Sequence, residues 1–229
     1  MPLADFDIYR RNVGSTVAIT TSSPLVDSGS LRWARGTIPG ANAWIDNLVP
    51  KSPGTLTPVG VLRGALACCV QIPTSFLDLN ASTHYTGILC LQSARDMAST
   101  GSGKRAYGLC LQATADAGIT TMALTLFPNA LANPIPTPLW SLTLPTPIAK
   151  GTLATFELEW DVNSLWGGIR FILRRGSTSN YTDLVQVHEF VYEVTPLPIV
   201  SVGEGPLLLS DTGDTLDFEV RLDQWRLRT

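Results

Sequence analysis

The chain has 229 residues, of which 45% are hydrophobic and only 15% charged, with a net charge of −3 and a mean hydropathy of +0.17. Soluble domains usually carry roughly 25% charged residues, so either the core is unusually large or partners cover part of the surface; we favour partners. The absence of a basic cluster argues against nucleic acid binding. The apolar run 60–72 is too short to cross a bilayer, and residues 1–12 lack the apolar region of a signal peptide.

The predicted elements are strands throughout. Residues 1–30 are small, polar and weakly patterned, and we expect an N-terminal arm or edge strand there. Residues 31–229 alternate short apolar runs with Gly- and Pro-rich turn signals, which is typical of an antiparallel two-sheet sandwich or a barrel. The predicted strands are 31–37, 57–70, 85–93, 106–114, 119–127, 138–144, 152–161, 168–175, 184–194 and 215–228.

Two similar phrases, "YTGILCLQSARD" (85–96) and "YGLCLQATAD" (107–116), indicate a hairpin rather than a solenoid, because no third copy occurs. Folding the chain about residue 100 would place Cys90 opposite Cys110. Whether these two oxidise depends on local geometry. The remaining cysteines, Cys68 and Cys69, are adjacent, and the four together lack zinc-ligand spacing, so we expect buried thiols.

The stretch "FELEWD" (156–161) places Glu157, Glu159 and Asp161 on one face of a strand. Paired carboxylates can cleave glycosidic bonds, but they are also common in cross-strand ion pairs. With 161–168 as the hairpin loop, Arg170 would lie opposite Glu159, and Arg174 further along the same face. We therefore favour a surface charge ladder, solvated or interfacial, over an active site.

The last strand, "LDFEVRLDQWRLRT" (216–229), alternates apolar and charged residues until its parity reverses. From Leu216 to Leu222 the apolar residues stand at even-numbered positions, whereas Trp225 and Leu227 stand at odd-numbered positions. A shift of one residue turns every side chain over. The pattern predicts a β-bulge near Asp223–Gln224.

The phrases "KRAYGLCLQATADAGITTMALTLF", "PLWSLTLPTPIAKGTLATFELEWDV", "GGIRFILRRG" and "LDFEVRLDQWRLR" follow one another in an order that resembles the concanavalin A-like, laminin-G-type jelly roll. The resemblance covers roughly residues 85–229. It implies two antiparallel sheets packed face to face. Members include lectin modules, family-16-type glucanases and phage virion modules, so the fold alone does not select a function. The glucanase pattern, Glu-x-Asp-x-(x)-Glu, becomes Glu-x-Glu-x-Asp here.

Other candidate sites are isolated. Trp166, with Gly167 and Gly168, falls in a predicted hairpin tip, where an exposed tryptophan would be a ligand platform or, as we favour, an interface anchor. The acidic loop with Asp211, Asp214 and Asp217 is a weak calcium candidate, since tight turns use the same residues. His84 and His188 have no recognisable nucleophile partner. We expect no resident metal or cofactor.

The sequence therefore predicts an all-β, antiparallel two-sheet jelly-roll sandwich with an N-terminal arm. The function we expect is a non-enzymatic structural or adhesive virion protein of a tailed phage, made in the host cytoplasm. Its partners would be copies of itself and other virion subunits, in a symmetric oligomer or lattice, without nucleic acid or membrane insertion. The alternatives are a carbohydrate-binding module that uses Trp166 on a cell-surface glycan and, less favoured, a family-16-like glycan hydrolase that uses Glu157 and Asp161.

Overall fold

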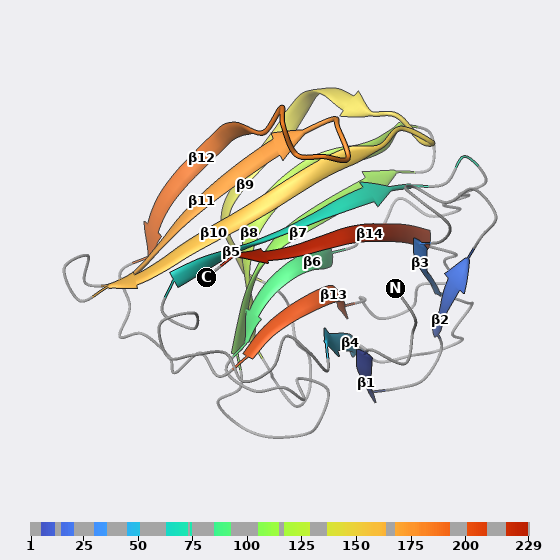
Figure 1. Cartoon of the computed structure of the whole chain (residues 1–229), viewed down its shortest axis with the longest axis horizontal. Helices are drawn as coiled ribbons and strands as arrows, with labels where there is room; N and C mark the ends of the chain where they lie inside the picture. The colour runs from blue at the N-terminus through green and yellow to red at the C-terminus, as the bar shows by residue number, and fades with distance from the viewer. Residues whose placement is uncertain are drawn as a thin grey trace.

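The computed structural model describes the chain as two packed β-sheets (Figure 1). The described residues are 6–11, 15–20, 30–35, 45–50, 63–72, 74, 85–92, 105–114, 117–128, 137–163, 168–192, 201–209 and 219–228. They form strands and turns with no helix, and so include no helix that could cross a membrane. The predicted all-β sandwich is confirmed.

The first sheet has the strand order β1-β4-β13-β6-β7-β8-β9, with antiparallel neighbours. In chain order its strands are β1 (Phe6–Arg11), β4 (Ile45–Pro50), β6 (Tyr85–Gln92), β7 (Arg105–Thr114), β8 (Gly118–Pro128), β9 (Thr137–Ile148) and β13 (Ser201–Leu209). Prolines at 138, 145 and 147 are accommodated in β9 because this strand lies at the edge of the sheet.

The second sheet has the order β12-β11-β10-β5-β14-β3-β2. Its strands are β2 (Ser15–Thr20), β3 (Ser30–Arg35), β5 (Arg63–Gln71), β10 (Ala154–Asn163), β11 (Gly168–Gly176), β12 (Val185–Tyr192) and β14 (Glu219–Arg228). In Figure 1, β10, β5 and β14 run side by side across the middle of the molecule. Residues 1–30 thus contain an outer strand of each sheet, β1 and β2.

The core lies between the two sheets and follows from the alternation of side chains along each strand. Phe156, Leu158 and Trp160 on β10 are at most 1% exposed. Tyr107 of the first sheet packs on Phe171 of the second, with ring centroids 5.8 Å apart. Burying a large apolar side chain contributes about 1.5–3 kcal/mol, so this layer fixes which face of β10 points outward.

All ten predicted strands overlap an observed one, but β4 and β13 are not predicted as strands, and residues 1–30, predicted as an arm or edge strand, contain two strands, β1 and β2. The β13 sequence, "SVGEGPLLL", has Gly203, Gly205 and Pro206 in its interior, which normally argues against a strand. The structure accommodates them with a register shift between Glu204 and Leu207. Tertiary pairing therefore overrides local propensity here.

Two details of register were also predicted. The bulge in β14 is confirmed, because its register against β5 shifts between Asp223 and Arg226. The pairing of Cys90 with Cys110 is wrong: Cys90 pairs with Gly108, and Cys110 with Gly87. The hairpin itself forms, but its register is offset by two residues near Cys90, and an irregularity between Gly87 and Leu89 adds to the offset.

Candidate functional site

The outward face of β10 carries the three acids that the sequence singles out. Phe156, Leu158 and Trp160 point into the core, so Glu157, Glu159 and Asp161 point away from it. On the neighbouring strand β5 the paired residues are small, with Ala67 opposite Glu157 and Ala65 opposite Glu159. The acids therefore extend from a floor of short side chains.

The β10–β11 hairpin is longer than predicted, and its register differs. Asn163 pairs with Gly168, so only residues 164–167 join the two strands, where the sequence predicts a loop over 161–168. Arg170 consequently lies opposite Asp161, and the prediction that it lies opposite Glu159 is wrong by two residues. The strand pairing continues past Asp161, since Val162 and Asn163 also pair with β11.

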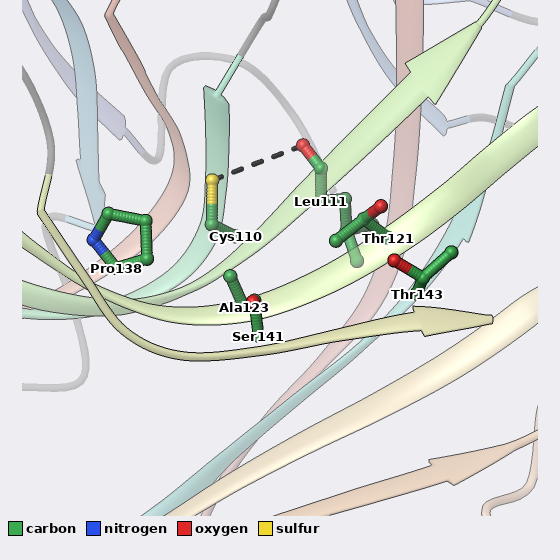
Figure 2. A pocket seen from close by; sticks show the side chains of 7 residues that line it. All are labelled: Cys110, Leu111, Thr121, Ala123, Pro138, Ser141 and Thr143. Atoms are coloured by element: carbon green, nitrogen blue, oxygen red, sulfur yellow. Dashed lines mark hydrogen bonds between the residues drawn. The ribbon is translucent and has the colours of Figure 1, made fainter.

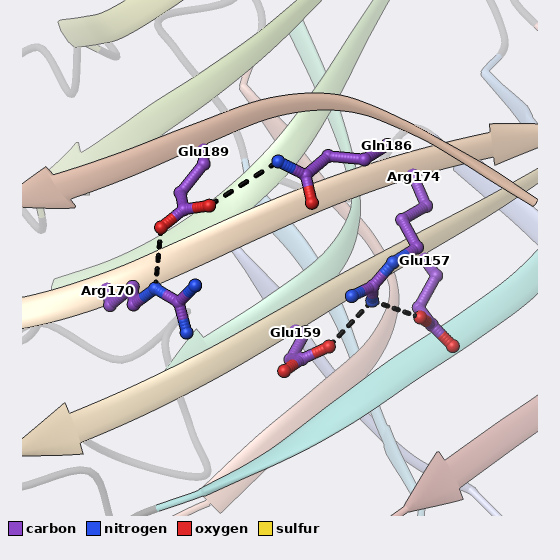
Figure 3. Close-up of polar contacts among 6 residues, drawn as sticks. All are labelled: Glu157, Glu159, Arg170, Arg174, Gln186 and Glu189. Carbon is purple, nitrogen blue, oxygen red and sulfur yellow. Dashed lines mark hydrogen bonds and ion pairs between the residues drawn. The ribbon is translucent and has the colours of Figure 1, made fainter.

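Arg174 joins the first two acids. Its Nη1 donates hydrogen bonds of 2.6 Å to Glu157 Oε1 and 2.6 Å to Glu159 Oε2 (Figure 3). The two accepting oxygens can therefore be no more than twice 2.6 Å, or 5.2 Å, apart. Glu157 is only 5% exposed. A nearly buried carboxylate of this kind requires a charged partner, and Arg174 provides it.

Two further ion pairs flank this centre. Arg63 Nε donates to Asp161 Oδ1 at 3.1 Å, and Arg170 Nε donates to Glu189 Oε1 at 2.8 Å. Gln186 donates to the other oxygen of Glu189 at 3.4 Å (Figure 3). We call the set the ionic face; it comprises Arg63, Glu157, Glu159, Asp161, Arg170, Arg174 and Glu189. It lies on the outside of the second sheet, across β5, β10, β11 and β12.

The pKa shifts follow these contacts. Burial would lower the pKa of Arg174, but its hydrogen bonds to Glu159 and Glu157 outweigh burial and raise that pKa above its usual value. The hydrogen bond from Arg170 lowers the pKa of Glu189, and the same bond raises the pKa of Arg170. Arg170 and Arg174 therefore stay positively charged.

A cavity of about 220 Å³ lies on the outside of the first sheet and is bordered by β7, β8 and β9; Figure 2 shows Cys110, Ala123 and Ser141 on these three strands. Its full lining is Cys110, Leu111, Thr121, Ala123, Pro138, Ser141 and Thr143. No ionisable acid or base other than the buried Cys110 thiol lines it. This cavity therefore offers no pair of acid and base side chains.

The remaining predicted candidates do not form a site in the described part of the chain. Gly168 is buried where β11 begins, whereas Trp166 and Gly167 lie outside the described residues. Asp211, Asp214 and Asp217, the weak calcium candidates, also lie outside them. His188 stacks on Trp140 with ring centroids 4.2 Å apart. Among the described residues, no group of three His, Cys, Asp or Glu side chains could hold a metal ion.

Sequence reasoning identified the acids but missed how they are paired. It considered Glu157 with Asp161, four residues apart, whereas the structure brings Glu157 together with Glu159, two residues apart, through Arg174. The two-residue spacing on one face and a nearby arginine were the available signals. Sequence reasoning also did not single out Tyr181, a residue between β11 and β12 that has a φ of 61°. No sequence pattern reveals such a backbone conformation.

No protein-family model and no curated protein matches the sequence, but solved structures share the fold. The endo-β-1,4-glucuronan lyase from the fungus Trichoderma reesei aligns with a TM-score of 0.60 and 12% identity, over 100% of this chain and 92% of that one. The GH131 β-glucanase catalytic domain from Podospora anserina gives 0.55 and 11%, over 98% and 85%. Alginate lyase Aly36B gives 0.51 and 14%, over 100% and 98%.

These comparisons confirm the jelly-roll resemblance and correct the predicted function. These similar structures are carbohydrate-active enzymes, which contradicts the prediction of a non-enzymatic phage virion protein and the prediction that the chain is not an enzyme. The prediction of an assembling virion protein rests on the low surface charge and the polar N-terminal segment. Neither property is specific to assembly, because exposed apolar surface also serves ligand binding.

Proposed function

We propose that the chain is a glycan-cleaving enzyme that binds a polysaccharide across the ionic face and uses Glu157 and Glu159 as its carboxylate pair. The observation that carries this proposal is that one Arg174 nitrogen binds both carboxylates, which keeps their accepting oxygens within 5.2 Å of each other. Retaining glycosidases also hold their two carboxyl groups at short range, about 5–5.5 Å apart. Asp161 pairs with Arg63 instead and becomes a flanking residue.

The roles of the two carboxylates follow from their exposure and their ion pairs. Glu157 is nearly buried and held in place by Arg174, which suits the nucleophile. Glu159 has a side chain 35% exposed and can meet the leaving oxygen as proton donor.

The similar structures support a polysaccharide substrate, since by their names they act on glucuronan, alginate and β-glucan. Eliminative cleavage of a polyuronate is the second candidate reaction. The observation that favours it is the set of arginines between the acids, because a guanidinium can neutralise a uronate carboxylate in bidentate fashion. A carboxylate would then remove the proton on the carbon beside that group, the glycosidic C–O bond at the neighbouring carbon would break, a double bond would form between these two carbons, and the leaving oxygen would take up a proton from water.

The test is a panel of neutral β-glucans and polyuronates incubated with wild type, Glu157→Gln and Glu159→Gln. We expect new reducing ends with wild type and a loss of about 10²–10⁴-fold in kcat for each variant. Ultraviolet absorbance of an unsaturated uronate distinguishes elimination from hydrolysis. Glu204→Gln, on β13 of the other sheet, is the matched control.

Two outcomes would contradict the proposal. Full activity in both Gln variants would remove the carboxylate pair from the reaction. Binding of a glycan without any cleavage would favour the carbohydrate-binding alternative, in which Trp166, in the segment between β10 and β11, is the proposed sugar platform. Loss of that binding in Trp166→Ala would then support the alternative.

A further inference from the structure

Tyr181 has a backbone conformation that tyrosine rarely adopts. It lies in the turn between β11 and β12, and its φ is 61°, in the left-handed region. Glycine and asparagine enter this region readily, whereas a residue with a bulky side chain pays free energy to do so. Such strain persists only where surrounding contacts enforce it, and it concentrates at functional sites.

Hydrogen bonds to the Asp183 carboxylate hold this turn together. The Asp183 carboxylate accepts hydrogen bonds from Ser177 N and Oγ, at 2.7 Å each, and from Thr178 N at 3.1 Å and Thr178 Oγ1. Tyr181 N donates to Thr178 O at 3.2 Å. The hydrogen bonds from Thr178 and Ser177 hold the pKa of Asp183 well below its usual range, so this carboxylate stays charged. The turn is therefore a rigid support for the Tyr181 side chain.

The turn folds onto the outer face of the second sheet beside the carboxylate pair. Cys69 Sγ donates to Tyr181 Oη at 3.7 Å, so the phenol reaches the floor of that face. Cys69 pairs with Thr155, and two residues along β10 lies Glu157, at about 3.3 Å per residue. A Cβ at Gly176 would lie 2.6 Å from Thr155 Oγ1 and 2.6 Å from Asp183, which shows how closely the turn packs here.

We propose that Tyr181 is a sugar-contacting residue, and that its half-buried ring forms the wall of the glycan site at the Cys69 end of the ionic face. This inference rests on the proposed function. Binding sites combine apolar, often aromatic, walls with a few convergent polar groups. Here Glu157, Glu159 and Arg174 are the polar groups, and the Tyr181 ring offers the adjacent apolar surface.

The test uses a substitution that fits the backbone better than tyrosine does. Tyr181→Asn removes the ring but suits the left-handed conformation. We expect its KM for the cleaved polysaccharide, and its dissociation constant in affinity electrophoresis, to rise about tenfold, the loss appropriate to one aromatic contact. We expect a smaller change in kcat and an unchanged or raised Tm. Tyr181→Phe, which keeps the ring, should stay within about threefold of wild type.

The control is Val185→Asn, at a position 68% exposed on β12, which should bind as wild type does. Affinity of Tyr181→Asn within twofold of wild type would overturn the inference, while the losses in Glu157→Gln and Glu159→Gln would still support the proposed function. A wild type that neither binds nor cleaves any glycan overturns both. If Tyr181→Asn does not fold, nitration of Tyr181 in wild type replaces this test. The polysaccharide should protect the ring from nitration, and equal nitration with and without polysaccharide would contradict the inference.

Discussion

The outer faces of the two sheets differ sharply although the strands beneath them obey the same alternation. On the first sheet, Thr121, Ser141 and Thr143 line an uncharged cavity. On the second, the ionic face places carboxylates and guanidiniums in hydrogen-bonded contact. Both sheets contribute inward apolar residues to one core. The difference teaches that the inward positions determine the fold, whereas chemistry depends on which outward positions pair across strands.

The largest stability effect that we expect compares a glycine from each sheet. Gly118 of β8 has a φ of +88°, and a Cβ there would lie 2.1 Å from the backbone oxygen of Ile148. Gly118→Ala should therefore cost about 3 kcal/mol of unfolding free energy. Gly176→Ala should cost less, about 1–2 kcal/mol, because the atoms it meets belong to side chains and not to the backbone. Urea denaturation measures both, and the reverse order would contradict this account.

The second effect separates buried from exposed ion pairs on the ionic face. Arg174→Ala leaves the nearly buried Glu157 without its cation, and we expect a loss of about 2 kcal/mol. Arg170→Ala breaks a pair with the exposed Glu189, so the loss should be below about 1 kcal/mol. Chemical denaturation at neutral pH gives both values. Equal losses would show that Glu157 does not depend on Arg174.

The third effect is acid sensitivity of the β11–β12 turn. The pKa of Asp183 is lowered, so its stabilising contribution is complete above the ordinary value of 3.8 and disappears as the pH falls through the lowered folded-state pKa. Asp183→Asn should therefore be less stable than wild type at neutral pH, and the difference should shrink towards strongly acidic pH. Thermal unfolding across pH measures it. A difference that is independent of pH would contradict the assignment.

The smallest effect belongs to the first sheet. Thr143 and Ser141 are exposed and line the uncharged cavity. Substituting alanine at each should change stability by less than about 0.5 kcal/mol, and should leave glycan cleavage unchanged. Activity assays on the double variant check this. Loss of activity there would move the glycan site to the first sheet.

The fold was predictable because alternation along a strand is a local property. Phe156, Leu158 and Trp160 show it directly, and so does the parity reversal in β14 that the bulge explains. Register was less accessible, since it depends on where a ladder stops pairing. The pairing of β10 with β11 extends two residues past Asp161, into the predicted loop 161–168, and this gives Arg170 the partner Asp161 in place of Glu159.

The site was only partly predictable. The acids on β10 are visible as a pattern, but the shared bond to Arg174 depends on side-chain geometry across two strands. Tyr181 lay in a segment without apolar periodicity, and its position over Cys69 results from the hydrogen bonds of Asp183. Long-range contacts of this kind do not leave a local signature in sequence.

The most direct test of the central claim is hydroxyl-radical footprinting of wild type with and without a polysaccharide that it binds. The account predicts protection of the peptides that span residues 154–192, which include β10, β11, the Tyr181 turn and β12, and no protection of residues 118–148, which include β8 and β9. Protection confined to β8 and β9, with none around Tyr181, would contradict the claim that the ionic face of the second sheet is the glycan site.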